Sequence, residues 1–150
     1  MNGAGKTTIV KLMFRFYDPE EKHNKLDGID LKKYDIYAVS KVSGVLFQDY
    51  VTYCLPLRKI IALSDFEERF NDEKLKKACN ISGVFEIIKD WEHGSDSVLD
   101  RYRADNRKDL SGEQWQLVGL ARAYFKESEY MILGEPSAAL DPISEDIIFE

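Results

Sequence analysis

Hydrophobic residues recur along the chain at two different spacings, which predict alternating helices and strands. From Ile9 to Phe16 they fall at helical spacing, and the Asp18-Pro19 pair ends the pattern. Two short apolar runs, at residues 45–47 and 130–133, are typical of buried strands. The pattern therefore predicts a first helix and two strands that lie far apart in the sequence.

The middle of the chain follows the helical spacing almost throughout. Residues 57–91 are mostly helical in pattern, with Asp72 as the expected N-cap of one helix, and a further helix is predicted from Ser111. Residues 92–109 are polar and predict loops. Strands that alternate with helices favour an α/β fold with a largely parallel sheet.

Composition narrows the class of protein. The chain has 150 residues, 44% of them hydrophobic and 32% charged, which suits one globular domain. The net charge of −6 argues against a nucleic-acid partner, and no apolar run approaches the roughly 20 residues that a membrane span needs. Cys54 and Cys79 stand far apart, so we expect neither a disulfide framework nor a zinc site.

Residues 2–8 form the first candidate binding motif. Gly5-Lys6-Thr7 matches the second half of the phosphate-loop pattern G-x-x-x-x-G-K-[ST], and the predicted helix follows directly. The backbone N–H groups of such a loop wrap a phosphate at the helix N-terminus. The expected nucleotide-binding residues are Asn2, Gly3, Ala4, Gly5, Lys6, Thr7 and Thr8. The alternative is a chance glycine turn before a helix.

Three further motifs follow in order. Residues 110–114, Leu-Ser-Gly-Glu-Gln, resemble the L-S-G-G-Q signature of ATP-binding cassette (ABC) ATPases. Residues 130–142 resemble the Walker B strand, catalytic glutamate and D-loop of that family, and residues 47–49 resemble its Q-loop. With the phosphate loop, this ordered set of motifs covers nearly all of the chain. The sequence around the motifs is most similar to that of the nucleotide-binding domain of an exporter-type transporter.

The resemblance implies an α/β fold of the P-loop NTPase class and the ABC ATPase type. It further implies a helical subdomain at approximately 57–120, inserted between the Q-loop and the signature. The family's domain has strands before Asn2 and more chain after Glu150. We therefore expect residues 1–150 to be a partial ABC nucleotide-binding domain, truncated at both ends.

For the nucleotide, the resemblance implies a head-to-tail pair of such domains. ATP would lie between the phosphate loop of one domain and the signature of the other. Lys6 would reach the β- and γ-phosphates. Ser111, Gly112 and Gln114 would face the γ-phosphate at a helix N-terminus.

For the metal and the reaction, the resemblance implies Thr7 and Gln48 as contacts of Mg²⁺ and Glu135 as the general base for the attacking water. Gln48 would also contact that water and sense a transmembrane domain, and Asp141 would help to organise the opposing site. The expected place is the cytoplasmic face of the cell membrane, reached through the membrane domain, with the fragment itself soluble.

Two residues depart from the family pattern. The family has aspartate where this chain has Gly134, and glycine where it has Glu113. Loss of the first carboxylate weakens the positioning of Mg²⁺, and Glu113 would repel a γ-phosphate. The chain also ends before the switch histidine of the family would appear. We therefore expect weak ATP binding and little or no hydrolysis.

Two alternatives stay open. One is a non-catalytic, degenerate cassette that acts only as a pairing module, or a gene remnant. The other is a soluble ABC ATPase of repair or translation. The short separation of Gln48 and Asp109 disfavours the second, because it leaves no room for a long coiled-coil or zinc insertion.

Overall fold

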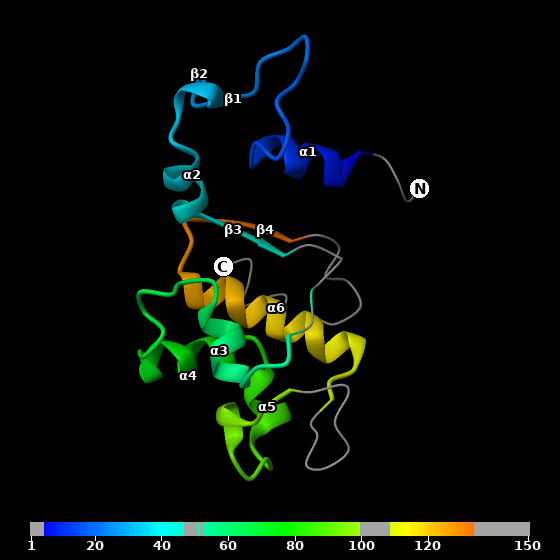
Figure 1. Ribbon diagram of the computed structural model, residues 1–150, viewed down its shortest axis with the longest axis vertical. Helices are drawn as coiled ribbons and strands as arrows, with labels where there is room; N and C mark the ends of the chain where they lie inside the picture. The colour runs from blue at the N-terminus through cyan, green and yellow to red at the C-terminus, as the bar shows by residue number, and fades with distance from the viewer. Residues whose placement is uncertain (1–4, 47–50, 52, 100–108, 134–150) are drawn as a thin grey trace.

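The computed structural model describes residues 5–46, 51, 53–99 and 109–133, with only the backbone of Lys6, Thr7 and Leu133. Figure 1 shows two parts, with the N-terminal elements at one end and a group of helices at the other. In chain order the elements are α1 (Lys6–Met13), β1 (Lys25–Leu26), β2 (Ile29–Asp30), the 3₁₀ turn η1 (Leu31–Lys33), α2 (Ile36–Val42), β3 (Ser43–Leu46), α3 (Leu57–Ala62), α4 (Asp72–Ile81), α5 (Val84–Ile88), the 3₁₀ turn η2 (Gly94–Asp96), α6 (Gly112–Lys126) and β4 (Tyr130–Leu133).

Strands from distant parts of the sequence form a parallel pair. β3 and β4 align from Ser43 opposite Tyr130 to Leu46 opposite Leu133. This pairing confirms both predicted strands and the parallel sheet, although β3 begins before the apolar run and Phe47 lies outside the described residues. β1 and β2 form a separate antiparallel hairpin, in which Asp27 and Gly28 both have positive φ, as a tight two-residue turn requires.

The first helix is shorter than its hydrophobic pattern. α1 ends at Met13, because Arg15 adopts a left-handed conformation with φ of 51°. The Arg15 N–H then bonds the Leu12 carbonyl at 3.1 Å, and the Phe16 N–H bonds the Lys11 carbonyl at 2.8 Å. These two bonds make a Schellman ending, which satisfies the last carbonyls of the helix. The prediction that the helix continues to Phe16 was therefore wrong by about one turn.

The helical part holds the main hydrophobic core. Most of its buried residues come from α3, α4, α5 and α6, and they include Leu57, Ile61, Val84, Val118 and Phe125. The predicted helix from Ser111 is confirmed as α6. The expected N-cap of α4 was wrong by one residue. Asn71 accepts the cap bond from the Lys74 N–H at 3.0 Å, whereas Asp72 pairs with Arg58.

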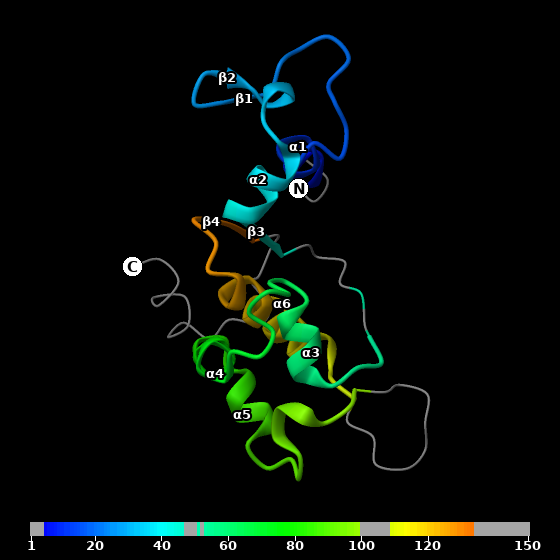
Figure 2. The same cartoon turned by 60° about the vertical axis from the view of Figure 1, so that its left-hand side comes forward.

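Helix α6 connects this core to the sheet. Figure 2 shows α6 between the β3–β4 pair and the other helices. It approaches β3 closely at Gly119, where an added Cβ would lie 2.4 Å from Cδ1 of the buried Leu46. At its other end, Lys126 Nζ donates to the carbonyls of Ser40 and Ser43. The boundary of the helical subdomain at approximately 57–120 stays a prediction, and α6 itself runs unbroken to Lys126.

Among the described residues, no helix combines the length and apolar character that crossing a bilayer requires.

Candidate functional site

The start of α1 presents backbone donors without a side-chain cap. Gly5 precedes the helix in the left-handed region, with φ of 79° and ψ of 4°, a conformation that glycine adopts without strain. Within the described part of the chain, no side chain accepts a hydrogen bond at this cap, and the first turn contains no acidic residue. Such a terminus has unsatisfied N–H groups and a positive dipole end, which favour an anion. Thr8 lies exposed in this turn, and Asn2, Gly3 and Ala4 lie outside the described residues.

The start of α6 is built differently. The Gln114 N–H donates to Ser111 Oγ at 3.2 Å, and the Ser111 N–H donates to Gln114 Oε1 at 2.9 Å. This reciprocal pair is a capping box, which satisfies two groups that an uncapped helix leaves open. The Ser-x-x-Gln spacing is a sequence signature of this box, whereas the resemblance implied a phosphate contact for both residues. Gln114 therefore has a structural role in addition to its predicted binding role.

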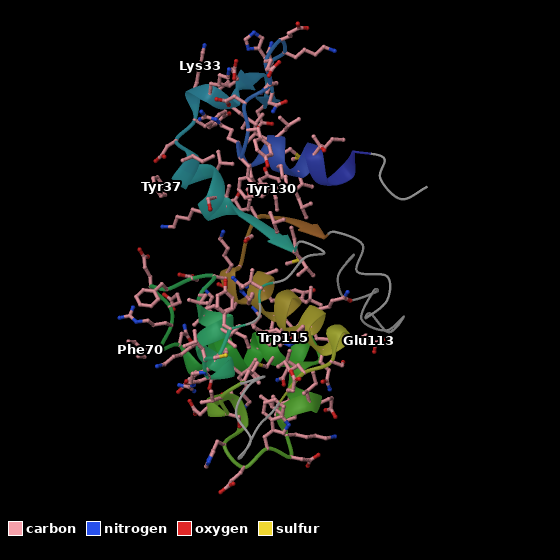
Figure 3. The ribbon with its side chains drawn as sticks, turned by 45° about the vertical axis from the view of Figure 1, so that its right-hand side comes forward. Lys33, Tyr37, Phe70, Glu113, Trp115 and Tyr130 are labelled. Carbon is pink, nitrogen blue, oxygen red and sulfur yellow. The ribbon has the colours of Figure 1, made fainter. Side chains whose placement is uncertain are left out.

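Burial fixes the orientation of this helix start. Leu110 and Trp115 are each only 7% exposed and anchor the segment on the helical core, while Ser111, Gly112 and Glu113 are exposed. Figure 3 shows Glu113 at the outer end of α6 and Trp115 among the helices. The carboxylate of Glu113 thus lies in the first turn, beside the positive end of the helix.

The sheet register relates two other candidates. Leu46 lies opposite Leu133 at the carboxyl ends of the parallel strands, and the sequence reaches Gln48 and Glu135 two positions after these residues. Open α/β sheets bind ligands at this edge. Gln48, Glu135, Asp141 and Gly134 themselves lie outside the described residues, so their roles stay predictions.

No metal cluster is present in the part of the chain that the structure describes: no group of three or more His, Cys, Asp or Glu side chains could hold an ion there. The ring Nδ1 of the exposed His23 lies 2.6 Å from a carboxylate oxygen of Asp30. That contact, with the Lys32 N–H as the larger cause, lowers the pKa of Asp30.

Comparison with known proteins decides the family. A family model described as ABC transporter matches residues 1–138. The chain belongs to the ABC transporter family. This finding confirms the predicted family and the predicted ABC-type α/β fold.

Relatives of the chain include two transport ATP-binding proteins and an ATP-dependent flippase, by their names. The chain is 37% identical over 149 residues to "Nisin transport ATP-binding protein NisT" of Lactococcus lactis subsp. lactis, covering 99% of the chain and 25% of that protein. It is 34% identical to "Subtilin transport ATP-binding protein SpaT" of Bacillus subtilis, covering 99% of the chain and 24% of that protein. It is 33% identical to the "ATP-dependent lipid A-core flippase" of Pasteurella multocida (strain Pm70), covering 96% of the chain and 24% of that protein.

A solved structure agrees with these relatives. A bacterial Atm1-family ABC exporter with ATP bound superposes with a TM-score of 0.81 at 28% identity, covering 99% of the chain and 25% of the exporter. The chain therefore spans about a quarter of the length of the ABC transporters that it matches. Membership of this family implies nucleotide binding, and the uncapped start of α1 fits an anionic ligand.

Proposed function

We propose that this chain binds ATP with Mg²⁺ as the nucleotide-binding part of an ABC exporter. The observation that carries the proposal is the helix start at Gly5, which has no side-chain cap among the described residues and no acidic residue in its first turn. The similarity to transport ATP-binding proteins over almost the whole chain supports it. The proposed partners are a second nucleotide-binding domain and a transmembrane domain at the cytoplasmic face of the membrane.

In this proposal each residue has a distinct task. Lys6 and the α1 N-terminus hold the β- and γ-phosphates, and Thr7 and Gln48 contact the metal. Mg²⁺, when bound, neutralises charge that develops on the phosphates. Glu135 accepts a proton from the attacking water. Ser111 and Gly112 face the γ-phosphate held by the opposing domain.

The structure of α6 supports the proposal that two domains associate only weakly around ATP. Its N-terminus already has a capping box, and Glu113 places a carboxylate beside it. A unit charge at about 5 Å from a phosphate charge, with an effective dielectric near 20, is repelled by roughly 3 kcal/mol. That energy corresponds to a decrease of about a hundredfold in the equilibrium constant for association of two domains around ATP. Gly134 in place of the family's aspartate removes a further metal contact, so we propose little or no hydrolysis.

The test measures ATP-dependent association of the chain with a complete ABC cassette, together with phosphate release. We expect Glu113→Gly to strengthen the association by about a hundredfold. Glu73→Gly is the matched control, because Glu73 is also an exposed acid in the first turn of a helix, α4, outside the proposed site. Robust turnover by the unmodified chain, abolished by Glu135→Gln, would contradict the proposed impairment.

A second candidate function is a non-catalytic pairing module. Gly134 in place of the family's aspartate favours it, because the loss of this carboxylate weakens the metal positioning that hydrolysis needs while leaving the start of α1 for the nucleotide. This candidate predicts association with a complete cassette but no phosphate release, even in the Glu113→Gly variant. Phosphate release restored by Glu113→Gly together with Gly134→Asp would favour the catalytic proposal instead.

A further inference from the structure

The segment between α3 and α4 places large aromatic side chains in solvent. Phe66 is 65% exposed and Phe70 is 77% exposed, whereas Ile60 and Ile61, just before them in α3, are at most 1% exposed. Figure 3 shows Phe70 at the outer side of the helical part. These two aromatic residues therefore contribute little to the hydrophobic core that lies beside them.

Arg69 holds the two rings in place. Its guanidinium carbon lies 4.2 Å from the ring centroid of Phe66 and 4.5 Å from that of Phe70. Its Nη1 also donates to the Phe66 carbonyl at 2.8 Å. Both rings remain mostly exposed beside Arg69, so their surface is accessible while these contacts restrain its movement. A restrained surface loses less conformational entropy on binding than a freely mobile one.

The surroundings of the rings are strongly acidic. Residues 64–73 contain five carboxylates and one guanidinium. Asp65 pairs with Lys74 at 3.0 Å and Asp72 with Arg58 at 2.9 Å. Glu67 and Glu68 are exposed and have no cationic partner among the described residues; Glu68 accepts only a hydrogen bond from Asn71.

We propose that the acidic aromatic surface, defined as Phe66, Glu67, Glu68 and Phe70, binds a cationic, amphipathic segment of a partner protein. Lysine or arginine groups of the partner would pair with Glu67 and Glu68, and its apolar groups would pack on the rings. Charge complementarity carries this choice of partner. A second copy of this chain is disfavoured, because two chains of net charge −6 repel each other.

The experiment uses two labelled synthetic peptides of identical lysine and leucine composition. In one the leucines recur at helical spacing, and in the other the order is scrambled. We expect fluorescence anisotropy to show binding of the amphipathic peptide, weakened at least about tenfold by Phe66→Ser with Phe70→Ser. The Glu67→Gln, Glu68→Gln variant keeps the rings, and we expect its binding to be weaker and less dependent on salt.

Tyr37→Ser is the matched control, since Tyr37 is 82% exposed in the N-terminal part of the molecule, and binding should not change. Equal binding of the scrambled peptide, or unchanged binding by both surface variants, would overturn the proposal. Concentration-dependent self-association of the chain that the double phenylalanine variant abolishes would also overturn it, by assigning the surface to a second copy. None of these outcomes depends on ATP, so the proposed nucleotide function is tested separately.

Discussion

The helical part and the N-terminal part of the chain have similar hydrophobic patterns but bury very different shares of their hydrophobic side chains. In the helical part, side chains from α3, α4, α5 and α6 form one buried core. In residues 5–42, only Leu31 and Val39 among the hydrophobic residues are buried. The stability of the described structure therefore resides mainly in the helical part, while the predicted phosphate loop precedes α1, in the part with the smaller core.

Helix α1 illustrates the difference most clearly. Ile9, Met13 and Phe16 follow one another at the spacing of a helix face, yet they are 58%, 44% and 57% exposed. On α6 the same kind of spacing buries Val118, Ala121 and Phe125 almost completely. An amphipathic pattern thus identifies the apolar face of a helix, but it does not identify what that face contacts.

The largest expected effect is a direct comparison of one phenylalanine from each part. Phe125 is 1% exposed, so Phe125→Ala removes buried surface and leaves a cavity, at a cost of about 3–5 kcal/mol in the free energy of unfolding. Phe16→Ala should change it by less than about 0.5 kcal/mol. Urea denaturation of both variants measures the two effects. Equal losses would show that the N-terminal part contributes as much to stability as the helical part.

The next effect is a dependence of stability on pH that arises in the helical core. Burial raises the pKa of the Cys79 thiol to about 11, from a usual value of 9.0. The folded state therefore binds this proton more tightly than the unfolded state, so the contribution is complete below pH 9 and declines as the pH rises toward 11. We expect a loss of about 2 kcal/mol over this range.

Variants of the two cysteines isolate this contribution. Cys79→Ala should lose the extra pH dependence, whereas Cys54→Ala should keep it, because Cys54 is exposed. Urea denaturation of each variant at pH 8 and pH 11 provides the measurement. If wild type and Cys79→Ala respond equally to pH, the thiol does not act as described.

A smaller effect concerns the contact that joins the two parts. Lys126, at the end of α6, donates through Nζ to the carbonyls of Ser40 and Ser43, the second at 2.7 Å. Lys126→Met keeps the length of the side chain and removes the donors, at an expected cost of about 1–2 kcal/mol. In this variant, exchange of the backbone amide hydrogens should become faster in α2 than in the wild type, with a smaller change in α4. Lys76→Met, at an exposed position of α4, is the control, and equal effects of both variants would contradict a specific role for Lys126.

The sequence predicted the features that depend on local pattern and missed those that depend on one backbone conformation. The α6 helix and the β4 strand followed from hydrophobic spacing, and the parallel pairing followed from the alternation of elements. The end of α1 did not follow from the hydrophobic spacing. It depends on a positive φ at Arg15, and arginine rarely adopts this conformation, so the sequence does not indicate it. Nor did the N-cap of α4 follow from the spacing, since Asn71 and Asp72 are both good caps and the contact with Arg58 decides between them.

The candidate site was predictable to a different degree at each helix start. A glycine-containing loop directly before a helix was predicted at Gly5, whereas the left-handed conformation of Gly5 is a finding of the structure. At α6 the resemblance indicated Ser111 and Gly112, and the Ser-x-x-Gln spacing is itself a sequence signature of the capping box between Ser111 and Gln114. The burial of Leu110 and Trp115, which directs Glu113 outward, depends on packing among α3, α5 and α6 and could not be read from the motif alone.

The smallest expected effect separates the structural role of Ser111 from its proposed binding role. Ser111→Ala removes the cap of α6 and should cost about 1 kcal/mol, a modest loss because the helix is held by its buried face. Ser111→Asp preserves an N-cap acceptor, so stability to urea should stay near that of the wild type. It adds a second carboxylate next to Glu113, however, and should weaken ATP-dependent association with a complete cassette further. If Ser111→Asp leaves that association unchanged while Ser111→Ala lowers stability, the start of α6 serves only to cap the helix, and the proposed contact with the γ-phosphate is wrong.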